Sequence, residues 1–200
     1  AGEYFKINDE EYLVVDNGSI RLESNLQNAQ FLCTSKVTNM KDLFNFRTRF
    51  NLDISQWDVG GVTNMVGMFQ NAKSFNHDIS NWDVSNVTDM EQMFFLAISF
   101  NKNLNDWDVS KVTKMNSMFD GAISFNQKIG NWDVSGVTEM IAMFSGANSF
   151  NQDIGSWDLS NTVNIAFMFW RANSFNQDIG DWDVSSIGFD HSMRGAFKDA

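Results

Sequence analysis

The stretch that decides the fold runs from residue 75 to residue 99 and reads FNHDISNWDVSNVTDMEQMFFLAIS. The same pattern returns every 25 residues between residues 50 and 187, without an insertion. Its register is marked by Phe50, Phe75, Phe100, Phe125, Phe150 and Phe175, each followed by Asn, and by Trp57, Trp82, Trp107, Trp132, Trp157 and Trp182, each followed by Asp. A strict repeat of this length is typical of a stack of coils, because each unit can bury its apolar side only against its neighbours.

Alternation around each Trp predicts a short strand. Trp82 and Val84 are two residues apart, so on a strand both face the core while Asp83 faces solvent. The Trp column is therefore predicted to be buried. The alternative is an aromatic platform for sugars.

The segment after the strand predicts a short helix. Met90, Met93, Phe94 and Ala97 follow the spacing i, i+3, i+4, i+7 of one apolar helix face. Thr88 is placed as the N-cap, and Glu91 three residues later would complete a capping box.

These elements predict an α/β fold, a right-handed leucine-rich-repeat-like solenoid of 25-residue coils. Residues 1–30 form an N-terminal cap, with a β-hairpin in which 11–15 and 19–22 flank the turn at 16–18. Residues 31–200 form the solenoid as one continuous domain. Its last unit is degenerate, because Asp190 and Arg194 stand where Met and Phe are expected.

The repeat W-D-V-S-x-V-T-x-M-x-x-M-F-x-x-A-x-S-F-N-x-D-I resembles the BspA-like leucine-rich-repeat surface proteins. In particular, it resembles the branch found in mycoplasma lipoproteins and Bacteroidetes surface proteins. The resemblance covers residue 31 to about residue 187. It implies placement outside the cell or on a bacterial cell surface, and a role in adhesion.

Composition and motifs exclude several classes of function. The net charge of −11 would repel a nucleic-acid backbone, and no apolar run approaches the ~20 residues of a membrane helix. Cys33 is the only cysteine, so no intrachain disulfide is expected. No G-x-S-x-G, H-E-x-x-H, P-loop or dinucleotide-binding pattern is present, so neither an enzyme nor a cofactor is expected.

Two polar columns accompany the core. The Asn that follows each column Phe is expected to bridge backbone groups of successive coils. The Asp that follows each Trp faces outward, and its stacked carboxylates need compensation. Either each Asp accepts hydrogen bonds from the Ser two residues on, or the column binds Ca²⁺ or a cationic ligand. The local hydrogen bonds are the favoured interpretation, because no calcium-loop motif is present.

Two surfaces are candidates for partner binding. The first, here called the Asp–Ser face, is expected on the inner curve of the solenoid and consists of Asn81, Asp83, Ser85, Asp106, Asp108, Ser110, Asn131, Asp133 and Ser135. The second, the apolar patch, consists of Phe95, Leu96, Phe167 and Trp170. The predicted function is non-catalytic recognition of a protein or glycan on another cell or matrix. The alternatives are a spacer within a larger surface protein, and a calcium- or glycan-binding module that uses the Asp–Ser face.

Overall fold

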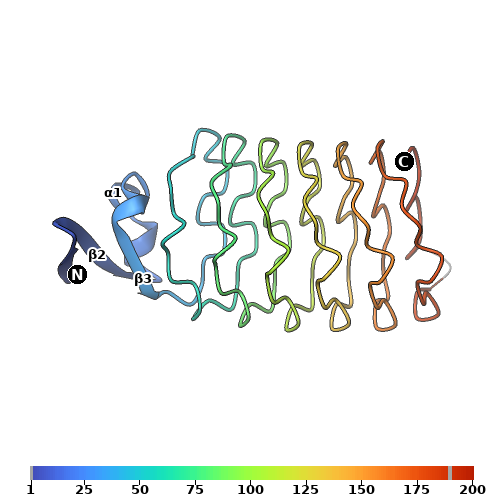
Figure 1. Cartoon of the computed structure of the whole chain (residues 1–200), viewed down its shortest axis with the longest axis horizontal. Coiled ribbons are helices and arrows are strands. Elements are labelled where there is room, and N and C mark those ends of the chain that lie inside the picture. Colours follow the sequence, from blue (N-terminus) through green and yellow to red (C-terminus); the bar gives the residue numbers. More distant parts are fainter. Residues whose placement is uncertain (1, 189–190) are drawn as a thin grey trace.

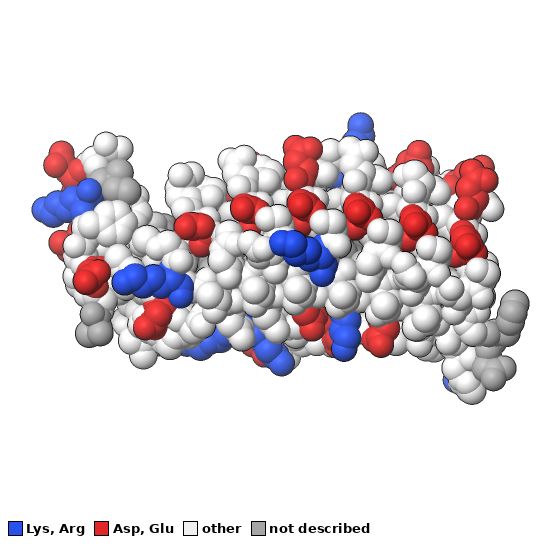
Figure 2. Space-filling view, turned by 90° about the horizontal axis from the view of Figure 1, so that it is seen from below, with Lys and Arg blue, Asp and Glu red and all other residues white. Residues whose placement is uncertain are grey.

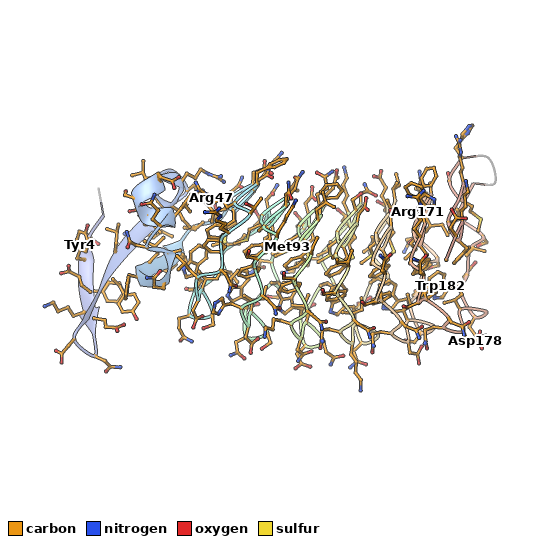
Figure 3. The ribbon with its side chains drawn as sticks, turned by 90° about the horizontal axis from the view of Figure 1, so that it is seen from above. Tyr4, Arg47, Met93, Arg171, Asp178 and Trp182 are labelled. Carbon is orange, nitrogen blue, oxygen red and sulfur yellow. The ribbon has the colours of Figure 1, made fainter. Side chains whose placement is uncertain are left out.

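The computed structural model describes residues 2–188 and 191–200. Figure 1 shows an N-terminal cap followed by coils that lie side by side along one axis, with the two chain ends at opposite ends of the stack. Seen at right angles in Figures 1 and 3, the stack is nearly straight. No helix among the described residues has the length and apolar character needed to cross a membrane.

The cap is a three-stranded sheet with short helices packed beside it. Its strands pair in the order β1-β2-β3, antiparallel between β1 and β2 and parallel between β2 and β3. The elements in chain order are β1 (Tyr4–Ile7), β2 (Glu10–Asp16), the 3₁₀ helix η1 (Ser19–Arg21), α1 (Glu23–Leu26), the 3₁₀ helix η2 (Ala29–Phe31) and β3 (Leu32–Lys36).

The hairpin of the cap differs from the predicted one. Residues 11–15 pair with β1 across a turn at Asn8 and Asp9, both at positive φ, and residues 19–22 do not form a strand. The carboxylate of Asp16 accepts the backbone N–H of both Gly18 and Ser19, at 3.1 and 2.8 Å. These bonds turn the chain into η1 instead of returning it along β2.

The coils contain neither the predicted strand nor the predicted helix. Over residues 37–188 the structure has turns joined by isolated parallel bridges. The bridges connect one position per coil, namely Asn39, Asn64, Asp89, Lys114, Glu139 and Asn164.

The backbone after each Thr cannot be helical because two of its residues are left-handed. Gln92 and Leu96 have φ of 56° and 54°, a conformation that an α-helix of L-residues excludes. The N–H groups of Met90, Gln92, Phe94 and Leu96 donate instead to carbonyls of the next coil, at 2.8–3.2 Å. Hydrogen bonds between coils therefore take the place of hydrogen bonds within a helix. Most of the intervening N–H groups donate to the carbonyl three residues earlier, which forms short turns.

Thr88 and Glu91 do not form a capping box. Both the backbone N–H and the Oγ1 of Thr88 donate to the carbonyl of Thr63, at 2.9 and 3.2 Å. The backbone N–H of Glu91 donates to Oδ1 of Asp89 at 3.0 Å. The repeated Thr therefore holds two coils together, and does not begin a helix.

The predicted burial is confirmed although the local elements differ. Met90, Met93, Phe94 and Ala97 are fully buried, and the Trp residues of the column are 3–8% exposed. Each indole N–H donates to a carbonyl 28 residues earlier, as from Trp82 to Ile54. Two columns of Phe rings stack through the core, one from Phe50 to Phe175 and the other from Phe44 to Phe197. Along each column the ring centroids are 5.5–6.2 Å apart.

The last unit is shifted in register, and its Met and Phe are less buried than those of the preceding coils. Ile165 donates to the carbonyl of Ser192, three residues later than the spacing of the preceding coils requires. Met193 and Phe197 then take the Met and Phe positions, and the Phe197 ring stacks on Phe169 at 5.5 Å. Arg194, which stands at the position expected for Phe, is exposed. Asp190 lies outside the described residues.

Candidate binding face

The Asp–Ser face is present on one side of three adjacent coils. Its nine residues are exposed, except for Ser85 and Ser135, which are half-buried. The buried Trp and Val on either side of each Asp hold the backbone in place. Because the stack is nearly straight (Figures 1 and 3), the expected inner curve is absent, and the face is an extended array.

Each Asp of the column closes a local turn with the residue two positions later. Oδ1 of Asp108 accepts the backbone N–H of Ser110 at 3.0 Å and its hydroxyl at 2.6 Å. Asp133 makes the same pair of bonds with Ser135, at 3.1 and 2.6 Å. The remaining Asp residues of the column accept the corresponding backbone N–H. The prediction of local hydrogen bonds is confirmed.

These hydrogen bonds favour the charged carboxylates. The Ser hydroxyl, followed by the Ser backbone N–H, lowers the pKa of Asp83 and of Asp108. The same two donors lower the pKa of Asp158 and Asp183. Repulsion from Asp108 acts against this at Asp83 but is a smaller effect. These four carboxylates are therefore ionised at neutral pH.

Figure 2 shows acidic side chains in a row along the coils, with basic side chains beside them. Lys111 lies next to the column, and its charge further lowers the pKa of Asp83 and Asp108. Its Nζ is 2.7 Å from Oδ1 of Asn86. This lysine offsets only part of the negative charge of the face.

The structure reveals two further turn positions, present in most coils, that the sequence reasoning did not identify as turns. Asp78 accepts the backbone N–H of Ser80, and Asp89 accepts that of Glu91. An Asn serves equally well, as Asn103 does for Asn105 at 3.0 Å. The signal was the Asp or Asn that most coils carry at these positions, since such a residue favours a turn by itself.

The Asn column bridges coils as predicted. From Asn76 onward, the backbone N–H of each column Asn donates to the side-chain oxygen of the Asn one coil earlier, at 2.8–3.0 Å. Oδ1 of Asn126 also accepts the Nε2 of Gln152. The amide thus satisfies backbone donors where no continuous strand could.

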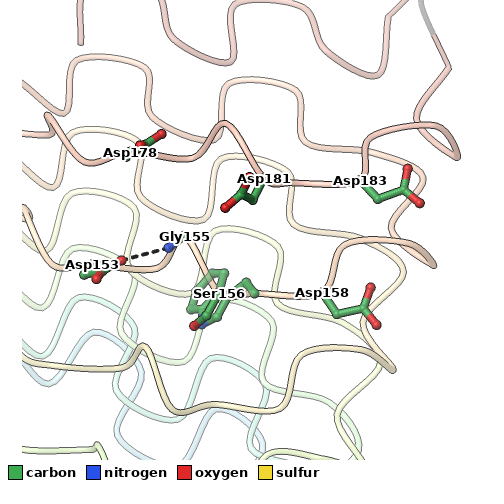
Figure 4. A pocket seen from close by; sticks show the side chains of 8 residues that line it. Asp153, Gly155, Ser156, Asp158, Asp178, Asp181 and Asp183 are labelled. Carbon is green, nitrogen blue, oxygen red and sulfur yellow. Dashed lines mark hydrogen bonds between the residues drawn. The ribbon is translucent and has the colours of Figure 1, made fainter.

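An acidic hollow of about 550 Å³ lies between the last two Trp-bearing coils (Figure 4). Asp153, Asp158, Asp178, Asp181 and Asp183 line it. Asp153 is itself bound to the N–H of Gly155 at 3.0 Å. Among the residues that the structure describes, no group of three or more His, Cys, Asp or Glu side chains is arranged to hold a metal ion.

The apolar patch is not one surface. Phe95 and Leu96 belong to one coil, while Phe167 and Trp170 lie three repeats later and contact each other edge to face at 6.1 Å. Asp120 and Ser145 occupy the column between Phe95 and Trp170. All four apolar side chains are half-buried.

Comparison with known proteins identifies a family but no characterised relative. The family described as "Mycoplasma protein of unknown function, DUF285" matches twice, over residues 17–122 and 97–200. No curated protein and no solved structure matches the chain. The two matches overlap and together cover most of the sequence, as a repeat family should. The chain therefore belongs to the DUF285 family of mycoplasma repeat proteins.

Proposed function

We propose that this chain is a non-catalytic binding module, secreted or displayed on a bacterial cell surface, that recognises a protein or glycan through the Asp–Ser face. The observation that carries the proposal is the turn made by each Asp. Carboxylates such as Asp108 and Asp133 repeat at a fixed spacing on a buried scaffold, so little conformational freedom is lost when a partner binds.

The chemistry of the face suggests the class of partner. Short polar side chains and ionised carboxylates suit a basic or hydroxyl-rich surface and disfavour an apolar one. The net charge of −11 would also draw a basic partner towards the stack over long range at low salt. A cationic protein segment or a neutral glycan is the expected ligand.

The placement among BspA-like leucine-rich-repeat surface proteins is part of this proposal. The repeat around each Trp supports it, as does the mycoplasma family match. In the same way we assign the stack to the right-handed leucine-rich-repeat-like solenoids. The absence of regular strands and helices from the described coils makes this chain an irregular member of that class.

The test uses the double variant Asp108→Asn with Asp133→Asn. Asn103 shows that Asn makes the same turn, so this change removes charge and keeps the fold. We expect weaker binding of a fluorescent oligolysine peptide, measured by anisotropy at low salt, and of neutral oligosaccharides on an array. The matched control, Phe95→Ser with Trp170→Ser, should bind normally. Loss of binding only in the control would contradict the proposal.

A spacer role is the second candidate, and the hydrogen bonding favours it. Each Asp of the column has its turn satisfied within its own coil, so the face needs no ligand for stability. A nearly straight stack would also separate two attached domains by a fixed length (Figure 1). A spacer would bind neither probe, and the double Asn variant would then be indistinguishable from the unaltered protein.

A further inference from the structure

Three aromatic side chains lie in a row on the sheet of the N-terminal cap. Phe5 on β1 pairs with Tyr12 on β2, and their rings stack with centroids 5.8 Å apart. The ring of Phe31, which directly precedes β3, meets the Tyr12 ring edge to face at 6.3 Å. Phe5 and Phe31 are 37% and 38% exposed, whereas most rings of the Phe and Trp columns are buried. These three residues are here called the aromatic row.

Strand alternation places the aromatic row on the side of the sheet that faces away from the core. On β2, Val15 is buried and Leu13 packs against the core. Tyr12 alternates with them and therefore points outward. At the start of β3, Leu32 is buried while Phe31 before it is exposed. The rings thus form an outer surface of the sheet and are not part of its core.

The aromatic row continues one column of the Asp–Ser face. The indole of Trp57 donates to the carbonyl of Ala29, 28 residues earlier, which is the spacing of the same bond in the later coils. The cap therefore precedes the first coil in the same register. Phe31 stands one repeat before Gln56, and Gln56 one repeat before Asn81 of the Asp–Ser face. A partner that lies along this exposed polar column reaches the three rings at the cap.

The surroundings of the aromatic row are acidic. Residues 3–16 contain five carboxylates and one lysine. Glu10 alternates with Tyr12 on the outward face, and its Oε2 accepts the Tyr12 hydroxyl at 3.3 Å. Glu3 is paired with Lys36 at 3.9 Å, but Glu10 makes no ion pair within the described part of the chain. A second copy of this cap would bring the same negative charge, so a cationic partner is favoured over self-association.

An arginine side chain is the cation that suits these groups. Its guanidinium is flat and less strongly hydrated than the ammonium of lysine, so it stacks on aromatic rings while its edge donates to carboxylates. Here Tyr12 supplies a ring and Glu10 supplies a carboxylate on the same face. The chain contains one such contact of its own, because the guanidinium of Arg171 lies over the Trp170 ring, 4.5 Å from its centroid.

We propose that the aromatic row binds an arginine side chain of a basic protein segment whose other cations face the Asp column. The guanidinium would lie against the rings of Tyr12 and Phe31, which stand at 68° to each other, and would donate to Glu10. This inference rests on the proposed function, because it assigns one end of the same partner. It also selects a cationic protein segment over a neutral glycan as that partner.

The test measures the affinity of the whole chain for fluorescent hexaarginine and hexalysine, which carry the same charge, by anisotropy at low salt. Arginine also pairs well with the Asp column, so the decisive variant removes the rings. Phe5→Leu with Tyr12→Leu keeps apolar side chains on both strands, and should weaken hexaarginine binding about fivefold while hexalysine stays within about twofold. Tyr12→Phe keeps the ring and should bind hexaarginine normally. Phe46→Leu is the matched control, since Phe46 is a 64% exposed ring on the first coil, outside the row.

Nuclear magnetic resonance of the unaltered protein locates the contact independently of affinity and of any variant's folding. A guanidinium stacked on the aromatic row should shift the ring-proton signals of Tyr12. Hexaarginine should produce this shift, hexalysine should produce a smaller one, and the ring protons of Phe46 should be unaffected by either peptide.

The inference is overturned if the double Leu variant binds hexaarginine as tightly as the unaltered protein, or if both peptides shift the Tyr12 ring signals equally. Failure of the proposed function is read from a different variant, since Asp108→Asn with Asp133→Asn would then bind both peptides normally. If neither peptide binds the unaltered protein, both proposals are wrong. Binding of neutral oligosaccharides, or self-association, that the double Leu variant abolishes would also overturn the inference, because the occupant would be a glycan or a second copy of this chain.

Discussion

The indole N–H of Trp132 donates to the backbone carbonyl of Leu104 at 2.9 Å, across the boundary between two coils. The donor lies in a side chain that is 3% exposed, so this carbonyl is satisfied without water. The same bond recurs at each Trp of the column. Trp therefore contributes apolar burial and one directional bond per coil, which fixes how successive coils are positioned.

Trp132→Ala should lower the free energy of unfolding by about 3–5 kcal/mol, the range for deleting a large buried side chain. Trp132→Phe keeps most of the volume and removes one of the two hydrogen bonds to the Leu104 carbonyl, which still accepts the backbone N–H of Trp107. The lost bond should cost roughly 0.5–1.5 kcal/mol. Denaturation in guanidinium would measure both. A loss below about 1 kcal/mol for the Ala variant would contradict the burial of the column.

Arg21 completes the bonding of the first coil. Because N–H groups such as that of Met40 donate toward the next coil, the first coil's own carbonyls are left facing the cap. The guanidinium of Arg21 donates to the carbonyls of Lys41 and Asn39, at 2.8 and 3.3 Å. Arg21→Met should reduce stability by about 1 kcal/mol, since both acceptors are on exposed residues. Lys73→Met serves as the control, and an equal loss there would contradict a capping role for Arg21.

The variant Ala142→Gly distinguishes a left-handed turn from a helix at this position, because the two conformations predict different changes in stability. The φ of Ala142 is 54°, which costs an L-residue roughly 1–2 kcal/mol relative to glycine. Ala142→Gly should therefore leave stability unchanged or raise it by up to about 1 kcal/mol. In a helix the same change would cost about 1 kcal/mol. Ala166→Gly, at a neighbouring position without positive φ, should destabilise the protein, and thermal unfolding of both variants gives the comparison.

The carboxyl group of Asp120 should make the protein more stable as the pH falls from 7 towards 4, which is opposite to the usual effect of an Asp side chain. Burial raises the pKa of the Asp120 carboxyl to about 6, while bonds to Ser145 and Ser117 act against this. The folded state thus binds the proton more tightly than the unfolded state, whose pKa is about 4, so the group's contribution to stability rises as pH falls from 7 towards 4.

Asp120→Asn should raise the unfolding free energy at pH 7 by about 1 kcal/mol, after discounting for partial exposure. At pH 4 the difference should shrink to a few tenths of a kcal/mol, because Asp120 is neutral in the folded state and about half protonated in the unfolded state near that pH. Urea denaturation at the two pH values measures the difference. A variant that is less stable at pH 7 would show that the carboxylate is favourably bound.

Calcium should not stabilise the protein. The Asp column is satisfied by Ser hydroxyl and backbone N–H groups, as at Asp108, so its carboxylates need no cation to offset burial. Thermal midpoints in excess chelator and in millimolar calcium chloride should coincide. A midpoint that rises with calcium concentration would show binding to the native state and favour the calcium-module alternative.

The sequence by itself determined the period, the buried columns and the outward direction of the Asp residues. Trp132, Val134 and Phe144 are buried as their spacing predicts, because the burial pattern follows side-chain type and repeat length. The bridging role of Asn126 and the Asp–Ser turns also followed from the sequence, because both depend on short polar side chains beside their own backbone.

Only the tertiary structure decided the path of the backbone. Met90, Met93, Phe94 and Ala97 have a spacing that fits a helix, and all four are buried, yet the chain turns at left-handed Gln92 and Leu96. The cause is the neighbouring coil, whose carbonyls accept the N–H groups that a helix would use internally. Those partners lie about one repeat away in the sequence, so no local pattern could reveal them. For the same reason the pairing of β1 with β2 and the shifted register of the last coil emerged only once the coils were stacked.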